Sequence, residues 1–258
     1  MSEIKVKQHP NFVNWQAENF RLTAFLSPSA QFTEQDWWKI LTNEVPERKT
    51  SEPRIGLQQE EGKFTSEKIE GKLVLTIQPT RIDWQLLPLL ENFNSGFPTI
   101  GSLADSLDSF FSLMLRWIEI APPIQRLAFG TVLNQSVNSS KEGYKLLSHY
   151  LPFDLNEDSS DFLYQINRPR KSASTGISDL LINRLSKWVV VTLVEGSIFA
   201  LSKPELYTNK PPQFSVRLEL DINTTPDFSM ELSPEQLNQV FQELVEFGKE
   251  IATKGDVK

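Results

Sequence analysis

Few side chains in this sequence could perform chemistry on a substrate. The 258 residues contain no cysteine and only two histidines, His9 and His149. A chain without cysteine has no disulfide, no thiolate metal ligand and no cysteine nucleophile. Neither histidine has a serine, an acid or a second histidine at the spacing of a catalytic triad or a zinc protease, and no GxGxxG, phosphate-loop or nucleophile-elbow motif is present. The sequence therefore predicts a protein that is not an enzyme and that needs no cofactor.

The main concentration of basic side chains lies in residues 168–187. This stretch holds five basic residues and one acidic residue, a local net charge of +4. One interpretation is a phosphate or nucleic-acid contact. The other, which we favour because the whole chain is acidic, is a solvated strand end or a cationic counterpart to the acidic carboxyl-terminal region. The residues concerned are Arg168, Arg170, Lys171, Arg184 and Lys187.

Two pairs of charged residues alternate along expected strands. Glu219 and Asp221 are two residues apart and could hold a divalent cation, but two-residue alternation on an exposed strand face produces the same spacing. Arg81 and Asp83, beside Trp84, could line a ligand cleft, although such a pair is more often an outward-facing ion pair. We therefore predict no metal site.

The neighbouring residues Trp37 and Trp38 are the best argument in the sequence for a protein partner. Successive positions on a helix point about 100° apart, so two indoles cannot both occupy the centre of one buried stripe. We expect one to pack inward and the other to lie near the edge. An exposed tryptophan is often an interface anchor, but tryptophans at the rim of a domain are also commonly half-buried.

Composition and charge describe a folded, acidic protein. The sequence is 39% hydrophobic and 10% aromatic, which is enough to bury a full core, and its net charge is −7. Residues 219–258 carry a net charge of −6, so the other 218 residues together carry −1. We expect no signal peptide, no membrane partner and a cytoplasmic location.

Hydrophobic periodicity predicts an α+β fold: a largely antiparallel sheet of about seven to nine strands, packed by two long amphipathic helices. We treat residues 1–258 as a single domain. Whether it consists of two pseudo-duplicated halves, about 1–150 and 151–258, is left open. The long helices are expected at 102–120, before Pro122 and Pro123, and at 233–253. Turns are expected at Gly62 and Gly71, and a loop at 43–52. The clearest expected strands cover 19–26, 72–78, 81–87, 124–132, 161–167, 180–193 and 214–222.

One stretch resembles a known family. LLINRLSKW, followed by FSVRLELDIN and a closing amphipathic helix, is similar to the end of an uncharacterised, sporadically distributed bacterial family, over at most the last hundred residues. Members of that family have a comparable strand with an LDI core before a final helix. The resemblance implies a cytoplasmic accessory protein of a mobile or defence-type gene set and supplies no catalytic residue.

These observations favour a non-catalytic binding subunit that acts through a protein partner or by self-association. Aromatic residues near the amino end would supply affinity, and the segregated acidic charge would steer a basic partner. The alternative is a nucleic-acid or phosphate-binding protein that uses the basic region at 168–187.

Overall fold

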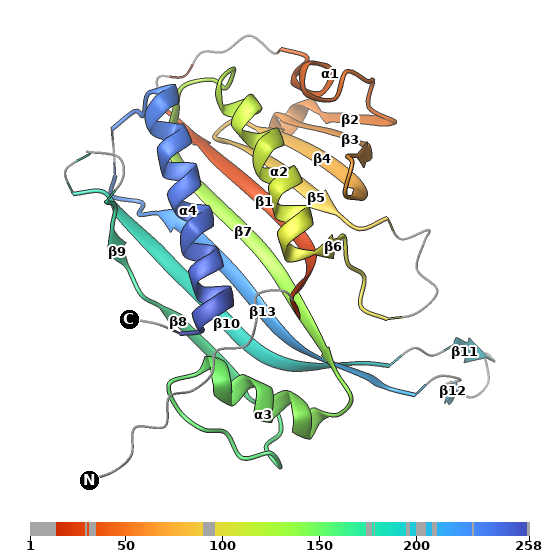
Figure 1. The fold of residues 1–258 in the computed structure, drawn as a ribbon. Coiled ribbons are helices and arrows are strands. Elements are labelled where there is room, and N and C mark those ends of the chain that lie inside the picture. The colour runs from red at the N-terminus through yellow and green to blue at the C-terminus, as the bar shows by residue number, and fades with distance from the viewer. Residues whose placement is uncertain are drawn as a thin grey trace.

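The chain folds around one large antiparallel sheet, as the computed structural model in Figure 1 shows. The structure describes residues 14–28, 30, 35–89, 96–173, 177, 179–194, 197–199, 205–207, 211–228 and 230–256. The strands are β1 (Gln16–Leu26), β2 (Arg48–Glu52), β3 (Leu57–Thr65), β4 (Glu70–Gln78), β5 (Arg81–Leu87), β6 (Gly101–Ser102), β7 (Ile124–Val137), β8 (Leu163–Asn167), β9 (Arg170–Lys171), β10 (Leu181–Leu193), β11 (Ser197–Phe199), β12 (Glu205–Tyr207) and β13 (Gln213–Thr224). The helices are α1 (Trp37–Thr42), the 3-10 turn η2 (Pro53–Ile55), α2 (Leu103–Ile118), α3 (Ser140–Tyr150) and α4 (Pro234–Lys254).

The order of the strands places β1 and β7 side by side in the middle of the sheet. In the described residues the sheet runs β2-β3-β4-β5-β1-β7-β13-β10-β8, with β6 paired to β1 and β9 to β10, while β11 and β12 pair separately. Read outward from the centre, β1-β5-β4-β3 and β7-β13-β10-β8 have the same order, and each set is followed along the chain by a long helix, α2 or α4. The expected α+β class with a mostly antiparallel sheet is confirmed.

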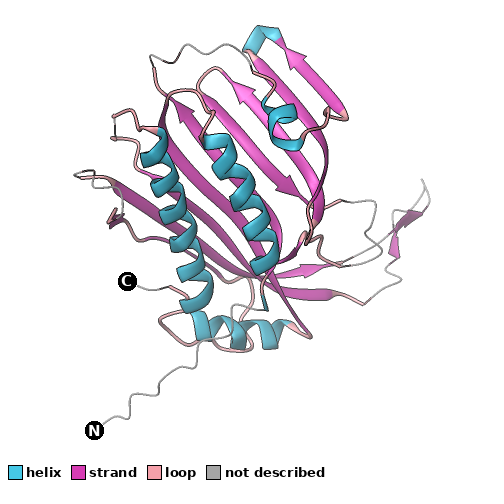
Figure 2. Cartoon of the chain, turned by 45° about the horizontal axis from the view of Figure 1, so that its top comes forward, coloured by secondary structure: helices cyan, strands magenta, loops and turns pink. Residues whose placement is uncertain are grey.

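The four α-helices of the described residues lie on the same side of the sheet (Figure 2). Alternation along each strand creates this side: Phe20, Leu22 and Ala24 of β1 are fully buried under the helices, and the residues between them face the opposite side. The α2 helix begins where Ser102 accepts a hydrogen bond from the Asp105 amide at 3.2 Å. At the start of α4, Ser233 and Gln236 form a complete capping box.

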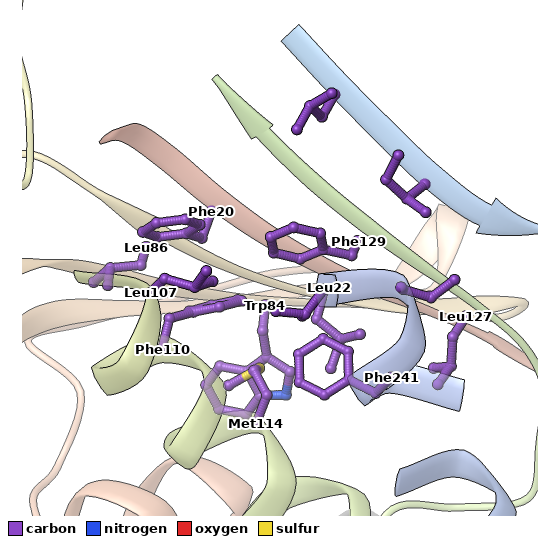
Figure 3. Packing of buried hydrophobic residues seen from close by; sticks show 14 of the residues in the cluster. Phe20, Leu22, Trp84, Leu86, Leu107, Phe110, Met114, Leu127, Phe129 and Phe241 are labelled. Atoms are coloured by element: carbon purple, nitrogen blue, oxygen red, sulfur yellow. The ribbon is translucent and has the colours of Figure 1, made fainter. Parts of the chain in front are cut away.

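Aromatic side chains fill the space between the helices and the sheet (Figure 3). Phe20 on β1 stacks on Phe110 of α2 with ring centroids 5.5 Å apart. Phe129 on β7 meets Phe241 of α4 edge-on at 6.3 Å. Each long helix thus packs on one of the two central strands, so the core is continuous across the middle of the sheet.

The two glycines expected to make turns lie inside strands, so those turn predictions were wrong. Gly62 is within β3 and Gly71 within β4. A Cβ at Gly62 would lie 3.0 Å from Trp38 Cζ2, and one at Gly71 would lie 2.8 Å from the Leu87 carbonyl oxygen. These glycines allow neighbours to approach closely, which is another use of glycine within a sheet.

The loop expected at 43–52 was also wrong in its second half. Residues 48–52 form β2, an edge strand in which every residue is exposed. Its charged sequence looked like a loop because an edge strand has no buried face to impose alternation.

Trp37 and Trp38 are both buried, each with 1% of its surface exposed. Trp37 meets Trp117 of α2 edge-on at 6.1 Å, whereas Trp38 stacks on Trp84 of β5 at 6.3 Å. The expectation that one indole lies at the edge was wrong, because α1 contacts two different elements, a helix and a strand. A partner-binding role for Trp37 and Trp38 required an exposed indole, and neither indole is exposed.

Candidate functional site

The five basic residues singled out in the sequence all pair with carboxylates. Arg168 forms two hydrogen-bonded contacts with Asp256, and Arg170 Nη1 lies 2.8 Å from Glu250 Oε2. Lys171 pairs with Asp179 at 3.3 Å, Arg184 with Glu250 at 3.1 Å and Lys187 with Glu219 at 3.1 Å. Arg168, Arg170 and Arg184 therefore bind the carboxyl-terminal segment.

Near its carboxyl end, α4 is held to the sheet by these contacts, which we call the terminal clamp (Arg168, Arg170, Arg184, Glu250 and Asp256). The Arg170 and Arg184 guanidinium groups each lie 5.1 Å from the centre of the Phe247 ring. The side chain of Arg184 is 1% exposed. The enclosed guanidinium of Arg184 is not available to a phosphate. Arg168 and Arg170 keep 26% and 35% of their side chains exposed, but both are already paired with carboxylates.

The carboxylates of the clamp are held in their ionised form. Burial alone would raise the pKa of Glu250, but the charges of Arg170 and Arg184 outweigh it and hold the pKa below its ordinary value. Burial would also raise the pKa of Asp256, but hydrogen bonds from Arg168 and Tyr164 hold the pKa of that carboxyl below its ordinary value. The Tyr164 hydroxyl donates to Asp256 at 2.6 Å.

The remaining candidate residues of the sequence occupy separate places. His149 is exposed on α3, with Nδ1 2.9 Å from the Lys145 carbonyl oxygen, and His9 lies outside the described residues. Asp83 is buried, accepts a hydrogen bond from Thr23 at 2.6 Å and pairs with Arg81 at 3.0 Å. Within the described part of the chain no three His, Cys, Asp or Glu side chains are grouped so as to hold a metal ion.

The side of the sheet opposite the helices, which we call the open face, brings together residues that are far apart in the sequence. No described helix packs on it (Figure 2). A row of residues in register crosses eight adjacent strands on this face. From β3 to β8 the row is Glu61, Val74, Gln85, Arg21, Gly130, Asp221, Leu185 and Asn167.

Arg21 and Gly130 form the centre of this row. A Cβ added to Gly130 would lie 3.2 Å from Arg21 Nη2, 3.3 Å from Nε and 3.5 Å from Cζ. The edge of the guanidinium formed by Nε and Nη2 is therefore the part nearest to that point. Arg21 Nε is buried and has no hydrogen-bond partner in the described residues. A Cβ at this position would press on the guanidinium, which would have to shift by a few tenths of an ångström.

The sheet is hollowed around this arginine. The central hollow has a volume of about 480 Å³ and is lined by residues of six neighbouring strands, from Gln85 and Leu87 on β5 to Gln165 on β8. At a spacing of about 4.8 Å per strand it extends over roughly 24 Å. Its charged residues balance: Arg21 and Lys187 against Glu219 and Asp221.

A second hollow continues the first toward β3. This side hollow has a volume of about 530 Å³ and shares Asn19 and Leu87 with the central hollow. It has three basic and three acidic lining residues, together with an apolar group formed by Leu87, Pro88, Leu89 and Pro98. The two hollows form one groove across the open face. Its surface is partly polar and partly apolar, and it carries equal numbers of basic and acidic side chains.

The sequence contains a partial signal for this site. Period-two alternation in NFRLTAFL places Arg21 opposite Phe20 and Leu22, and so on the outward side. The same alternation in FSVRLELDIN places Asp221 outward, whereas residues 124–132 are apolar on both faces and give no direction for Gly130. Whether Arg21, Gly130 and Asp221 stand in one row depends on strand register, which cannot be read from a local sequence pattern.

No family model, no curated protein and no solved structure matches this chain. None of the described helices is long and apolar enough to cross a membrane.

Proposed function

We propose that this protein is a non-catalytic accessory subunit that binds a segment of a partner protein in the groove across the open face of the sheet. One observation carries the proposal: the described helices cover a single face, and the other bears a groove lined by residues of nine strands, from β2 to β8 in the order of the sheet. The proposal assumes that α2 and α4 are amphipathic helices and that their apolar sides cover the first face. It also takes the protein to be cytoplasmic, as the sequence predicts.

The chemistry of the groove favours a protein segment over a polyanion. Basic and acidic residues are equal in number along both hollows, so the groove has no net attraction for phosphates. The amide side chains Asn19, Gln85 and Gln165 can both donate and accept, which suits a peptide backbone. The apolar group at Leu87 to Leu89 offers a place for one apolar side chain of the partner.

Selection from a library of random 12-residue peptides tests this proposal. Peptides that bind should shift the methyl NMR signals of Leu87, Val132 and Leu185, which line the groove, and leave the signals of the core residues Leu107 and Leu244 in place. Val132→Arg should weaken binding at least tenfold by filling the central hollow. Ser112→Arg, on the exposed side of α2, is the matched control and should leave affinity unchanged.

Two results would contradict the proposal. One is selected peptides whose shifts map to the helices; the other is an affinity that Val132→Arg does not change. Self-association is the second form of partner binding that the sequence predicts. If it uses the open face, light scattering should detect a dimer in the parent protein and a monomer in Val132→Arg.

Nucleic-acid binding by the residues at 168–187 stays the alternative, and the pairing of all five cations with carboxylates does not support it. We expect fluorescence anisotropy with single-stranded and double-stranded oligonucleotides at low salt to show no binding at micromolar protein. Binding that weakens steeply with salt and disappears in Lys171→Gln would favour the alternative, since displaced counterions make phosphate binding salt-dependent.

A further inference from the structure

We infer that Arg21 binds the side-chain carboxylate of an aspartate or glutamate in the bound partner segment. This inference rests on the proposed function, because it assigns a contact at the centre of the same groove. Arg21 is then a specificity-determining residue of the open face, which selects segments that carry an acidic residue.

Arg21 has no partner among the described residues. Its Nε is buried and makes no hydrogen bond. Its Nη atoms have no hydrogen bond or ion pair to a described residue either, but they are not buried, so they are accessible from the central hollow that Arg21 lines. The guanidinium therefore presents free donors to the groove.

Every other half-buried or buried arginine of the described residues donates to an acceptor of the chain. Arg126 donates to the Thr224 carbonyl oxygen at 2.9 Å. Arg217 donates to Glu18 at 3.0 Å, and the three arginines of the terminal clamp donate to its carboxylates. Polar groups withdrawn from water almost always have partners, so an arginine with none indicates an acceptor that comes from outside the chain.

Glu219, one of the two carboxylates that line the central hollow, is already paired with other cations. It lies 3.1 Å from Lys187 Nζ and 3.3 Å from Arg217 Nε. Two cations thus share this carboxylate, and neither of them is Arg21.

Asp221, the other carboxylate of the central hollow, also interacts away from Arg21. Its Oδ1 accepts a hydrogen bond from Asn223 at 3.1 Å. Burial lowers the pKa of Arg126, and the charges of Asp227 and Asp221 oppose that effect. The recorded interactions of Asp221 are therefore with Asn223 and Arg126.

Arg21 is thus the charged lining residue of the central hollow that has neither a hydrogen bond nor an ion pair within the described chain. A carboxylate from the partner would supply the missing opposite charge and accept from the free donors. Hydrogen bonds between two charged groups are shorter and stronger than neutral ones, so a carboxylate suits this arginine better than a backbone carbonyl oxygen. One carboxylate matches one cation, which agrees with a groove that does not attract polyanions.

The apolar part of the groove lies within reach of the same segment. The guanidinium edge is next to Gly130 on β7, two strands from β5. Leu87 on β5 is two residues along from Gln85, which pairs with Arg21. About 12 Å therefore separates the guanidinium from Leu87, roughly four residues of extended chain. A 12-residue peptide can place an acidic side chain at Arg21 and an apolar one at Leu87.

The test uses 12-residue peptides selected for binding to the full-length protein and then synthesised with an amidated carboxyl end, so that only side chains supply carboxylates. We expect the peptides that bind the groove to share an aspartate or glutamate. Exchanging it for asparagine or glutamine should weaken binding by the parent protein about tenfold. Only the acidic form should shift the ¹⁵N signal of Arg21 Nε–H. This comparison needs no variant protein.

A pair of variants then locates the contact. Arg21→Gln should bind the acidic and amide forms of a peptide with affinities within about twofold of each other, because the two changes remove the same interaction. Lys187→Gln, which removes the other cation of the same hollow, is the matched control. It should keep the tenfold preference for the acidic form, since Lys187 is already paired with Glu219. Thermal melts check that both variants fold.

Three results overturn the inference and leave the proposed function standing: groove-binding peptides that need no acidic residue, an acidic preference that survives in Arg21→Gln, and one that is lost equally in Lys187→Gln. If no selected peptide binds the groove, the inference and the proposed function both fail.

Discussion

Asp256 is a single carboxylate that joins three parts of the molecule. It accepts hydrogen bonds from Tyr164 on β8 and from Arg168, while its own amide donates to the Tyr150 carbonyl oxygen at the end of α3 at 2.8 Å. The turn that places it needs Gly255, whose φ of 81° lies in the left-handed region and whose Cβ would overlap the Tyr150 backbone. The turn that follows α4 is thus held by specific polar contacts.

The clamp carboxylates predict a loss of stability in acid. The folded pKa values of Glu250 and Asp256 lie below their ordinary values of 4.5 and 3.8. Each carboxylate therefore contributes stability that is present above the ordinary value and is lost as the pH falls through the folded one. The free energy of unfolding should depend less on pH between 5 and 3 in Asp256→Asn than in the parent protein. Asp108→Asn, at an exposed carboxylate, is the control, and equal slopes in all three proteins would contradict the prediction.

The two buried indoles predict a large cost of truncation. Trp38→Ala should lower the free energy of unfolding by about 3–5 kcal/mol, since it leaves a cavity beside Trp84. Ile40→Ala on the same short helix is the control, because Ile40 is 55% exposed. Urea titrations give both values; a Trp38→Ala protein as stable as Ile40→Ala would show that the indole is not part of the core.

Among the elements, α2 depends on one buried side for its place on the sheet. Leu107 has 2% of its surface exposed, and Ser112 lies on the exposed side of the same helix. Leu107→Ala should destabilise the protein by about 2–5 kcal/mol, the usual cost of removing a buried leucine side chain. Ser112→Ala should change stability by under about 0.5 kcal/mol. Thermal melts measure both, and matching midpoints for the two variants would mean that α2 does not pack as described.

For the molecule as a whole, the shared centre of the sheet predicts one cooperative unit. The two sets of strands meet along the β1–β7 pairing, and the core runs across it. Calorimetry should show a single unfolding transition whose calorimetric and van't Hoff enthalpies agree. Two separate transitions would indicate that the halves fold as independent domains.

The similar order of the two sets of strands is what a duplication would produce. The change from one set to the other falls between α2 and β7, at residues 119–123, rather than near residue 150. Expression of residues 1–121 alone should give a protein that aggregates, because β1 would lose the pairing that covers its edge. A soluble, folded fragment would contradict this.

The sequence by itself determined those features that depend on neighbouring residues. The expected strand at 81–87 coincides with β5, and the expected strands at 180–193 and 214–222 lie within a residue or two of β10 and β13. Serines 102 and 233 were correctly expected to cap the two long helices. Periodicity and capping operate over a few residues, so they can be read from one segment at a time.

Only the tertiary structure decided which distant residues meet. Trp37 and Trp38 are both buried because α1 lies between a helix and a strand. Arg170 and Arg184 are paired because α4 brings Glu250 to them, and Arg168 is paired because the turn after α4 brings Asp256 to it. About a hundred residues separate Arg21 from Gly130, and about as many separate Gly130 from Asp221. Strand register alone brings these three residues into one row. Register is set by the packing of the whole buried face, and a slip of one residue would turn each of these side chains to the other side. For that reason the groove and its arginine appear only in the folded protein.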